Sequence, residues 1–255
     1  MNTKRLQTAI AIFIPCSNVG FLSAALVYDA YFFHFTILAF IIADVLLYLY
    51  LPQGMQMKLV FRIAGLPFLY YLTTAAALFF SNNMFLSLFL LGSLFFLQIC
   101  YFFIQRGKDT LEKTNSLFSQ MSLYICYGIF FSLSIFFFSL IYFLDVPFWH
   151  LVLPFLLIIL VAGDAIFFRL GIDQYTRVLI SLTSAVSITE LLYAISWLPL
   201  DYLGMTGVAS LLYAVYMDIL YSSLREEDQL KKKILFSGVL VLCMLFLILA
   251  LARWR

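Results

Sequence analysis

The stretch Asp29-Ala-Tyr-Phe-Phe-His34 decides the fold, because a second version of it stands at Asp145-Val-Pro-Phe-Trp-His150. The chain has two histidines, and each lies five residues after an aspartate and directly after an aromatic residue. A further aspartate follows each histidine inside an apolar run, Asp44 after 10 residues and Asp164 after 14. That difference is about one helical turn. The pattern predicts a parallel internal duplication.

The composition around these motifs is that of a membrane protein. Hydrophobic residues make up 65% of the chain and charged residues 11%, and the mean hydropathy is +1.05. Soluble domains have about twice this share of charged residues. A net charge of +2 gives no reason to expect a nucleic-acid partner. The four cysteines lie in separate apolar runs without a Cys-x-x-Cys pair, which predicts neither a disulfide framework nor a zinc site.

Nine apolar runs are long enough to cross about 30 Å of hydrocarbon. They lie near 7–28, 30–51, 60–80, 84–105, 118–143, 148–170, 178–199, 203–224 and 234–253. The sequence therefore predicts an all-α integral membrane bundle of nine transmembrane helices. Asp29, Asp145 and Asp201 each stand where a following helix begins, so we expect their carboxylates to cap those helices.

The basic residues predict the orientation of this bundle, because Lys and Arg accumulate in cytoplasmic loops. With a cytoplasmic N-terminus, only Arg253 and Arg255 fall outside. The others fall inside, namely Lys4, Arg5, Lys58, Arg62, Arg106, Lys108, Lys113, Arg169, Arg177, Arg225, Lys231, Lys232 and Lys233. We therefore expect a multi-pass protein of the inner (plasma) membrane with an external C-terminus.

Four polar residues share one expected depth in the even-numbered helices. Asp44, Gln98, Asp164 and Asp218 each lie about six residues before an inner helix end, which is about 9 Å at helical rise. An offset of 120 residues pairs Asp44 with Asp164 and Gln98 with Asp218. These offsets predict two parallel four-helix repeats, 1–116 and 117–233, related by an axis along the membrane normal. The ninth helix, in 234–255, is an addition to them.

The same buried polar residues are the candidate binding site. A carboxylate in the hydrocarbon costs several kcal/mol or more, so intramembrane acids face the bundle interior, pair, or stay neutral. Glu190 lies near the middle of the seventh span with no basic residue at its depth, and is the first choice for a functional residue. Asp44, Asp164, Asp218 and Gln98 are further ligand-binding candidates. A purely structural hydrogen-bond network explains Asp44, Asp164 and Asp218 almost as well.

Two other features carry local chemistry. Arg169 and Arg177 lie beside Asp164 and Asp173 at the inner mouth of the sixth and seventh spans, where they can contact a phosphate or lipid head group. The cytoplasmic bias of basic residues explains both arginines equally well. Pro15 interrupts the first span and predicts a kink that can line a cavity.

The layout resembles the UbiA prenyltransferase superfamily. Ala43-Asp44, and Asp164 with Asp173, stand where that family has its aspartate-rich motifs. The resemblance implies nine helices, an inside N-terminus, an internal repeat, and prenyl transfer with magnesium and diphosphate at these motifs. The family's first motif has further aspartates three and seven positions on, where this chain has Leu47 and Leu51. Its motifs are therefore not intact in this chain.

The end of the seventh span, the eighth span and the C-terminus are also similar to bacterial polytopic membrane proteins, a likeness that implies no activity. Taken together, these features favour a membrane-embedded binder or carrier of a small, lipidic or cationic ligand at the repeat interface. We expect membrane lipids as its surroundings and no metal or other cofactor. A degenerate UbiA-like lipid prenyltransferase, and a structural or partner-anchoring membrane subunit, are the alternatives.

Overall fold

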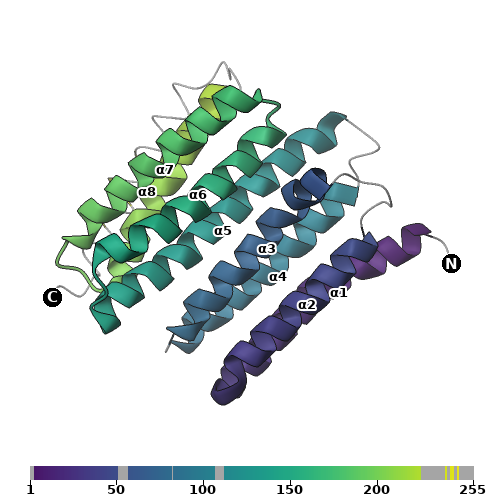
Figure 1. Cartoon of the computed structure of the whole chain (residues 1–255), viewed down its shortest axis with the longest axis horizontal. Coiled ribbons are helices and arrows are strands. Elements are labelled where there is room, and N and C mark those ends of the chain that lie inside the picture. The colour runs from purple at the N-terminus through teal and green to yellow at the C-terminus, as the bar shows by residue number, and fades with distance from the viewer. Residues whose placement is uncertain are drawn as a thin grey trace.

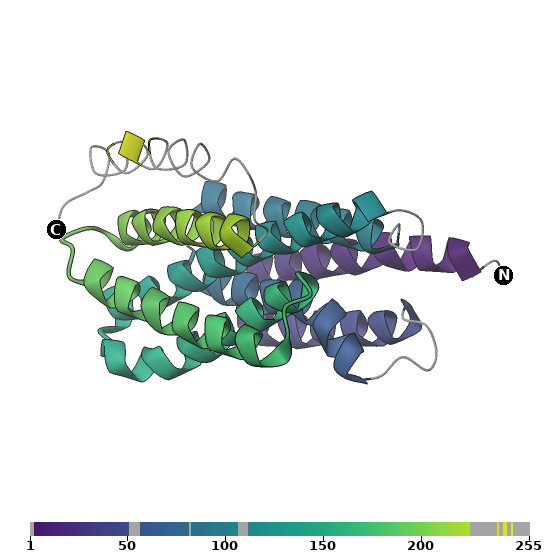
Figure 2. The same ribbon diagram turned by 90° about the horizontal axis from the view of Figure 1, so that it is seen from above.

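The computed structural model describes residues 3–50, 57–81, 83–106, 112–224, 239, 242, 243 and 246. At positions 3–7, 29, 44–50, 57–64, 106, 112–116 and 169 it describes the backbone alone. In this part of the chain there are eight α-helices, one short 3-10 turn and no β-strand. Figures 1 and 2 show the helices running along one shared direction, as expected for a membrane bundle.

The helices begin and end within a few residues of the first eight expected spans. They are α1 Thr3–Val27, α2 Phe32–Tyr50, α3 Met57–Phe79, α4 Met84–Arg106, α5 Glu112–Leu144, α6 Phe148–Arg169, α7 Gln174–Ser196 and α8 Tyr202–Leu224, with the turn η1 Asp29–Tyr31 between α1 and α2. The expected ninth helix, 234–253, lies outside the described residues except at four helical positions. The described structure thus has eight of the nine expected helices.

Six of these helices are long and apolar enough to cross a membrane. They contain the segments Thr8–Val27, Met84–Gln105, Leu117–Leu144, Phe148–Phe168, Gln174–Ser196 and Tyr202–Leu224. Shorter apolar segments lie in α2 and α3, at Phe32–Ala43 and Gly65–Phe79. The chain is therefore a multi-pass helical membrane protein by the length and composition of its described helices.

Helix α5 is the centre of the bundle. It has 33 residues, which makes it about 50 Å long, and it packs against α3, α4, α6 and α8. Of its candidate span, 61% is buried, against 33–39% for the other five. The ring of Phe130 on α5 stacks on Tyr213 of α8 with centroids 3.9 Å apart. Buried serines on α5 allow its neighbours to approach closely, as in other membrane bundles.

The two groups of four helices share their internal neighbours. Helix α1 packs on α4 as α5 packs on α8, and α2 packs on α3 as α6 packs on α7. The contact between the groups is one-sided, because α5 packs on α3 and α4. A two-fold axis would give α1 matching contacts with α7 and α8, and no comparable contacts join these helices in the described residues. Figure 1 accordingly shows α1 and α2 at one edge of the bundle and α7 and α8 at the other.

The caps of the helices agree only in part with the sequence-based expectation. Asp201 caps α8, because its Oδ1 accepts a hydrogen bond of 2.8 Å from the Gly204 amide. Asp145 does not cap α6. It lies in the left-handed region with a φ of 49°, and Pro147, whose side chain makes no cap bond, holds the N-cap position. The side chain of Asp29 lies outside the described part.

Two caps were missed by the sequence analysis. Asn83 Oδ1 accepts from the Phe85 amide at 2.9 Å at the start of α4. Asp173 Oδ2 accepts from the Thr176 amide at 3.0 Å at the start of α7. The Thr176 amide lowers the pKa of the exposed Asp173 carboxyl below its ordinary value. Both residue types are favoured N-caps, so a search for Asn and Asp before each apolar run would have found them.

Candidate functional site

The sequence-predicted polar residues lie in separate places rather than in one site. Asp164 pairs with Arg177 between α6 and α7, whereas Gln98 lies in a neutral network between α1, α3 and α4. Glu190 is exposed on α7. The side chain of Asp44 lies outside the described part, although its neighbour Ala43 lines a small cavity beside Gln98. The described positions of Asp164 and Glu190 therefore do not bring these two candidate residues together.

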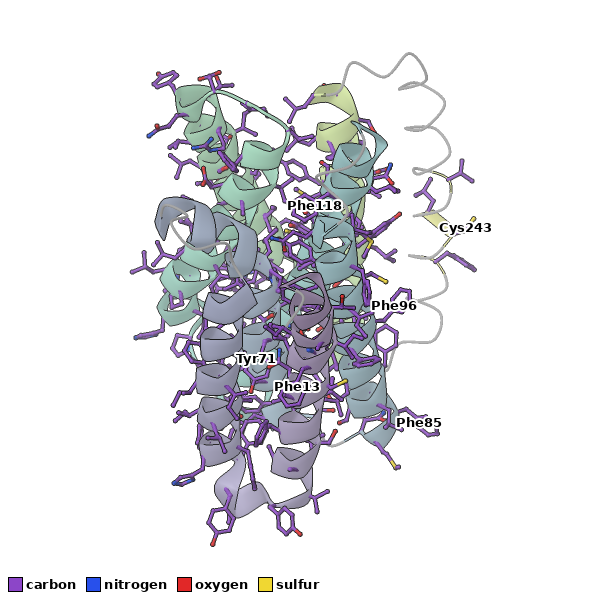
Figure 3. The ribbon with its side chains drawn as sticks, turned by 90° about the vertical axis from the view of Figure 1, so that its right-hand side faces the viewer. Phe13, Tyr71, Phe85, Phe96, Phe118 and Cys243 are labelled. Atoms are coloured by element: carbon purple, nitrogen blue, oxygen red, sulfur yellow. The ribbon has the colours of Figure 1, made fainter. Side chains whose placement is uncertain are left out.

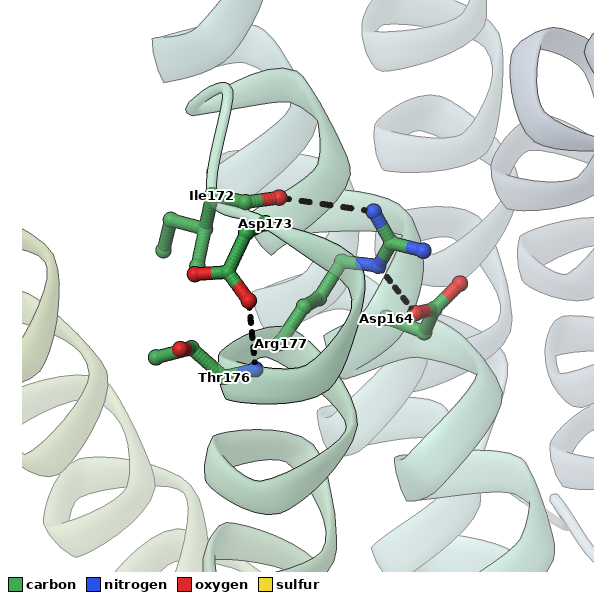
Figure 4. Close-up of polar contacts among 5 residues, drawn as sticks. All are labelled: Asp164, Ile172, Asp173, Thr176 and Arg177. Atoms are coloured by element: carbon green, nitrogen blue, oxygen red, sulfur yellow. Dashed lines mark hydrogen bonds and ion pairs between the residues drawn. The ribbon is translucent and has the colours of Figure 1, made fainter.

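The Asp164–Arg177 pair joins α6 and α7 near the turn between them. The Arg177 side chain is 6% exposed and that of Asp164 is 30% exposed, and Arg177 Nε donates a hydrogen bond to Asp164 Oδ1 (Figure 4). Arg177 Nη1 also donates to the Ile172 carbonyl at 3.5 Å, and its guanidinium lies 5.3 Å from the centre of the Phe168 ring. Arg177 therefore points into the helix pair and is held there from several sides.

The ion pair with Asp164 affects whether Arg177 can make the expected contact with a phosphate or lipid head group. The Arg177 guanidinium has its charge balanced inside the protein by Asp164, so it is a structural cation in this arrangement. The side chain of Arg169 lies outside the described part. Asp173, which stood in the same sequence cluster, serves as the α7 cap and does not join the ion pair.

A neutral hydrogen-bond chain joins α1, α3 and α4. Gln98 Nε2 donates to the Pro67 carbonyl at 2.9 Å, and Asn18 Nδ2 donates to Gln98 Oε1 at 3.0 Å. The carbonyl can only accept, so it fixes the orientation of the Gln98 amide and then of the Asn18 amide. Asn18 Oδ1 is left buried without a hydrogen-bond partner among the described residues. The two side chains are 2% and 1% exposed, so this is a core network.

Two proline-containing helices meet at this network. Pro15 lies one turn before Asn18 in α1, and Pro67 lies in α3. Each proline removes a helical hydrogen bond and loosens local packing. A cavity of about 20 Å³ lies here, and its lining includes Ile14, Tyr71 and Gln98. That volume fits about one water molecule and no larger ligand.

A larger cavity lies elsewhere, at the boundary between α1–α4 and α5–α8. Its volume is about 530 Å³. Aromatic and aliphatic side chains form most of the wall. The lining residues are Tyr70 from α3, Phe89, Ser93, Phe96 and Leu97 from α4, Met121, Tyr124, Tyr127, Gly128 and Phe131 from α5, and Ser210 from α8. We call this space the interface cavity. Phe89, Phe96 and Tyr124 are each more than half exposed and form its open side.

Gly128 allows the Tyr70 ring to form part of the wall of the interface cavity. A Cβ at position 128 would lie 2.6 Å from Cζ of the Tyr70 ring, so only glycine lets this ring lie against α5. The Tyr70 hydroxyl lies 2.8 Å from Ser93 Oγ. Because Ser93 donates to the Leu90 carbonyl at 2.9 Å, its oxygen accepts from Tyr70. The ring is thereby fixed between α4 and α5.

The predicted acid Asp218 lies on the α8 side of the cavity. Tyr127 donates to the Ala214 carbonyl at 3.4 Å and lies within electrostatic range of Asp218. Ser210, Ala214 and Asp218 follow each other at four-residue spacing, so they share one face of α8. Asp218 thus lies beside the cavity wall, whereas Gln98, its expected counterpart, lies in the separate neutral network.

The sequence analysis missed the interface cavity because no motif marks it. Its aromatic residues are typical of any membrane helix, and the distinguishing signal is a pair of small residues, Ser93 and Gly128, that leaves room between large rings. That signal becomes visible only once α4 and α5 are known to be neighbours.

Among the described residues, no group of three or more His, Cys, Asp or Glu side chains is placed to hold a metal ion. No protein-family model, curated protein or solved structure matches the chain.

Proposed function

We propose that this chain is a membrane-embedded binder or carrier of a neutral lipidic molecule, held between α1–α4 and α5–α8. The observation that carries the proposal is the interface cavity, whose volume is about 530 Å³. Ligand pockets commonly measure about 300–1,000 Å³ and are mainly apolar with a few polar groups. The cavity lies at the boundary between the two expected repeats, where the sequence analysis expected a ligand.

The chemistry of the wall favours an uncharged ligand. The described lining contains no charged side chain, and its polar groups are tyrosine and serine hydroxyls. Tyr70 and Tyr127 each use their hydrogen in a protein hydrogen bond, so their oxygens remain as acceptors. A lipid with an apolar chain and a hydroxyl head group matches such a wall. Such a lipid would enter the interface cavity laterally from the bilayer, because exposed aromatic side chains on membrane helices form the open side of the cavity.

The wider arrangement belongs to the same proposal. We infer nine transmembrane helices with a cytoplasmic N-terminus and an external C-terminus in the inner membrane. The positions of Arg106, Arg169 and Arg177 support this orientation, because all three fall at the same end of the antiparallel helices. We also infer that α1–α4 and α5–α8 arose by duplication. Their shared neighbour relations support this inference.

A binding experiment with a matched pair of variants tests the proposal. Purified protein in detergent is titrated with geranylgeraniol and, separately, with dioleoylglycerol, and the unfolding temperature is measured. We expect at least one probe to raise the unfolding temperature of the unchanged protein. Phe96→Ala removes an exposed wall residue of the cavity and should weaken binding about tenfold, or about 1.4 kcal/mol. Phe85→Ala removes a ring from the same helix that is 85% exposed, against 63% for Phe96, and that lies outside the described lining, so it should leave binding unchanged (Figure 3).

Three results would overturn the proposal. The first is that neither probe raises the unfolding temperature. The second is that Phe96→Ala and Phe85→Ala weaken binding equally. The third is near-complete disulfide formation between Phe96→Cys and the native Cys243, which would place the segment 234–253 over the cavity. Transfer of a prenyl group from a prenyl diphosphate in the presence of Mg²⁺ would instead favour the UbiA-like alternative.

A further inference from the structure

Glu190 is an acid on the outside of the bundle at membrane depth. It lies in the candidate span Gln174–Ser196 of α7, six residues before the helix end, which is about 9 Å at helical rise. Trp197, just beyond that end, is 73% exposed, as expected for an aromatic residue at the membrane interface. Glu190 is exposed, and no hydrogen bond or ion pair joins it to another described residue. Its carboxyl therefore faces the hydrocarbon in a single copy of the chain.

Glu190 belongs to a polar stripe along α7. Thr183, Ser187, Glu190 and Ala194 are all exposed, and they follow each other at spacings of four, three and four residues. These spacings place them on one helix face. Leu179, Leu182 and Val186 flank the stripe and are also exposed. We call these seven residues the outer face of α7.

The opposite side of α7 already has its partners. Ser181, Ser184 and Thr189 are buried against the bundle, and Ser184 Oγ accepts a hydrogen bond of 3.0 Å from the Tyr216 hydroxyl of α8. The polar residues of the outer face are thus not the ones that hold α7 in its own bundle. Small and hydroxyl-bearing residues on such a face allow close helix approach and hydrogen bonds between helices in membranes.

We propose that the outer face of α7 binds the same face of a second copy of this chain, with the two Glu190 side chains at the centre. An acid at this depth is costly unless it is paired or neutral. In its neutral form a carboxyl group both donates and accepts a hydrogen bond, so it can pair with its own copy or with Ser187.

The second copy is the fitting partner because the face is complementary to itself. A two-fold dimer buries one identical patch from each subunit. This patch has the Ser187 hydroxyl, the Glu190 carboxyl and the small Ala194 along one line, whereas the Thr183 hydroxyl already donates within its own helix. A cationic partner helix would need its own charge in the hydrocarbon, and no described lysine or arginine of this chain lies at the depth of Glu190. The proposal is independent of the lipid ligand, since α7 contributes no residue to the described lining of the interface cavity.

The test measures self-association in lipid. The full chain is labelled with donor or acceptor dyes, reconstituted into liposomes, and diluted with lipid while energy transfer is followed. We expect a dimer whose dissociation constant rises about tenfold or more in Glu190→Leu. Glu190→Gln keeps a donor and an acceptor and should retain most of the association. Gln120→Leu removes an exposed polar side chain from α5 and serves as the matched control, with an expected unchanged dissociation constant.

A crosslinking experiment fixes the geometry. Ala194→Cys is introduced after the four native cysteines are replaced by serine or alanine, and oxidation in liposomes should give a covalent dimer. Val161→Cys, exposed on α6, should not. Monomers at every protein-to-lipid ratio would overturn the proposal, as would equal association of the unchanged protein and Glu190→Leu. Unaltered lipid-probe binding by Glu190→Leu would separate this result from the proposed function.

Discussion

The two halves of the bundle satisfy their buried polar groups with different chemistry. In α1–α4 the groups form a neutral chain from Asn18 through Gln98 to the Pro67 carbonyl. In α5–α8 the ion pair of Asp164 with Arg177 joins α6 to α7. The turns before α4 and α8 differ in the same way, because an amide caps α4 and a carboxylate caps α8.

Burial explains this difference. Asn18 and Gln98 are almost fully buried between three helices, where an uncharged network has the smaller desolvation cost. Asp164 is 30% exposed near the helix ends, where water and lipid head groups can reach one side of the pair. A charged pair is tolerated only near the helix ends, where one side of it can be solvated. Equal distance from a helix end in the sequence therefore does not mean an equal environment in the bundle.

The largest expected effect comes from breaking the ion pair. Arg177→Met leaves the Asp164 carboxylate in a half-buried place without its cation, which should lower the free energy of unfolding by about 2–3 kcal/mol. This loss is smaller than that for a fully buried pair, because Asp164 is partly exposed. Unfolding by sodium dodecyl sulfate in mixed micelles measures the change.

The control for the ion pair replaces both partners. Asp164→Leu with Arg177→Met should recover most of the lost stability, because no unpaired charge remains. If Arg177→Met alone is as stable as the unchanged protein, the pair does not hold α6 and α7 together. The two halves would then differ in which polar residues they contain, but not in how those residues stabilise the bundle.

The second effect comes from the centre of the neutral chain. Gln98→Leu leaves the Asn18 amide and one lone pair of the Pro67 carbonyl without their partner, which should cost about 2 kcal/mol. The loss of stability should be the same at pH 5 and at pH 8, because the hydrogen-bond chain from Asn18 through Gln98 to Pro67 contains no titrating group. Unfolding in mixed micelles at both pH values measures this. A clear pH dependence would show that a charged group, such as the neighbouring Asp44, takes part.

Much of this fold follows from the sequence, because membrane helices are set by length and apolarity alone. The starts and ends of α1–α8 could be predicted to within a few residues, and Asp201 could be predicted as a cap. Asp145 was wrong as a cap because Pro147 follows it by two residues. The residue before a proline is disfavoured in the helical region, so the helix does not extend back through Val146; α6 begins after Pro147, and Asp145 is left in the turn.

The site was far less predictable, because the sequence reports depth in the membrane but not the direction in which a side chain points. Glu190 and Gln98 both read as intramembrane polar residues, yet Gln98 is 1% exposed and Glu190 is exposed. Which face of a helix meets its neighbours depends on packing between helices that share no simple pattern. The interface cavity depends on such packing too, since Gly128 matters only where the Tyr70 ring crosses α5.

The third effect compares the caps of α4 and α8. Asp201→Ala and Asn83→Ala each remove an acceptor for the first amides of a helix and should cost about 1 kcal/mol. Asp201→Asn should keep most of the stability, since either side-chain oxygen can accept the Gly204 amide. Unfolding in mixed micelles tests all three variants. A loss in Asp201→Asn as large as in Asp201→Ala would show that the carboxylate charge, and not its hydrogen bond, stabilises the turn.

The smallest expected effect is the most informative about the neutral half. Asn18→Leu removes the hydrogen bond to Gln98 and leaves Gln98 Oε1 unsatisfied, which is unfavourable by about 1 kcal/mol or more. It also removes Asn18 Oδ1, which is buried without a described partner and carries a similar penalty. The two changes oppose each other, so the free energy of unfolding should move by less than about 0.5 kcal/mol. A loss as large as that of Gln98→Leu would mean that Asn18 Oδ1 has a partner, such as a water molecule in the adjoining 20 Å³ cavity. The neutral half would then be a hydrated network, and its contrast with the ion pair of α6 and α7 would be smaller than the side-chain contacts indicate.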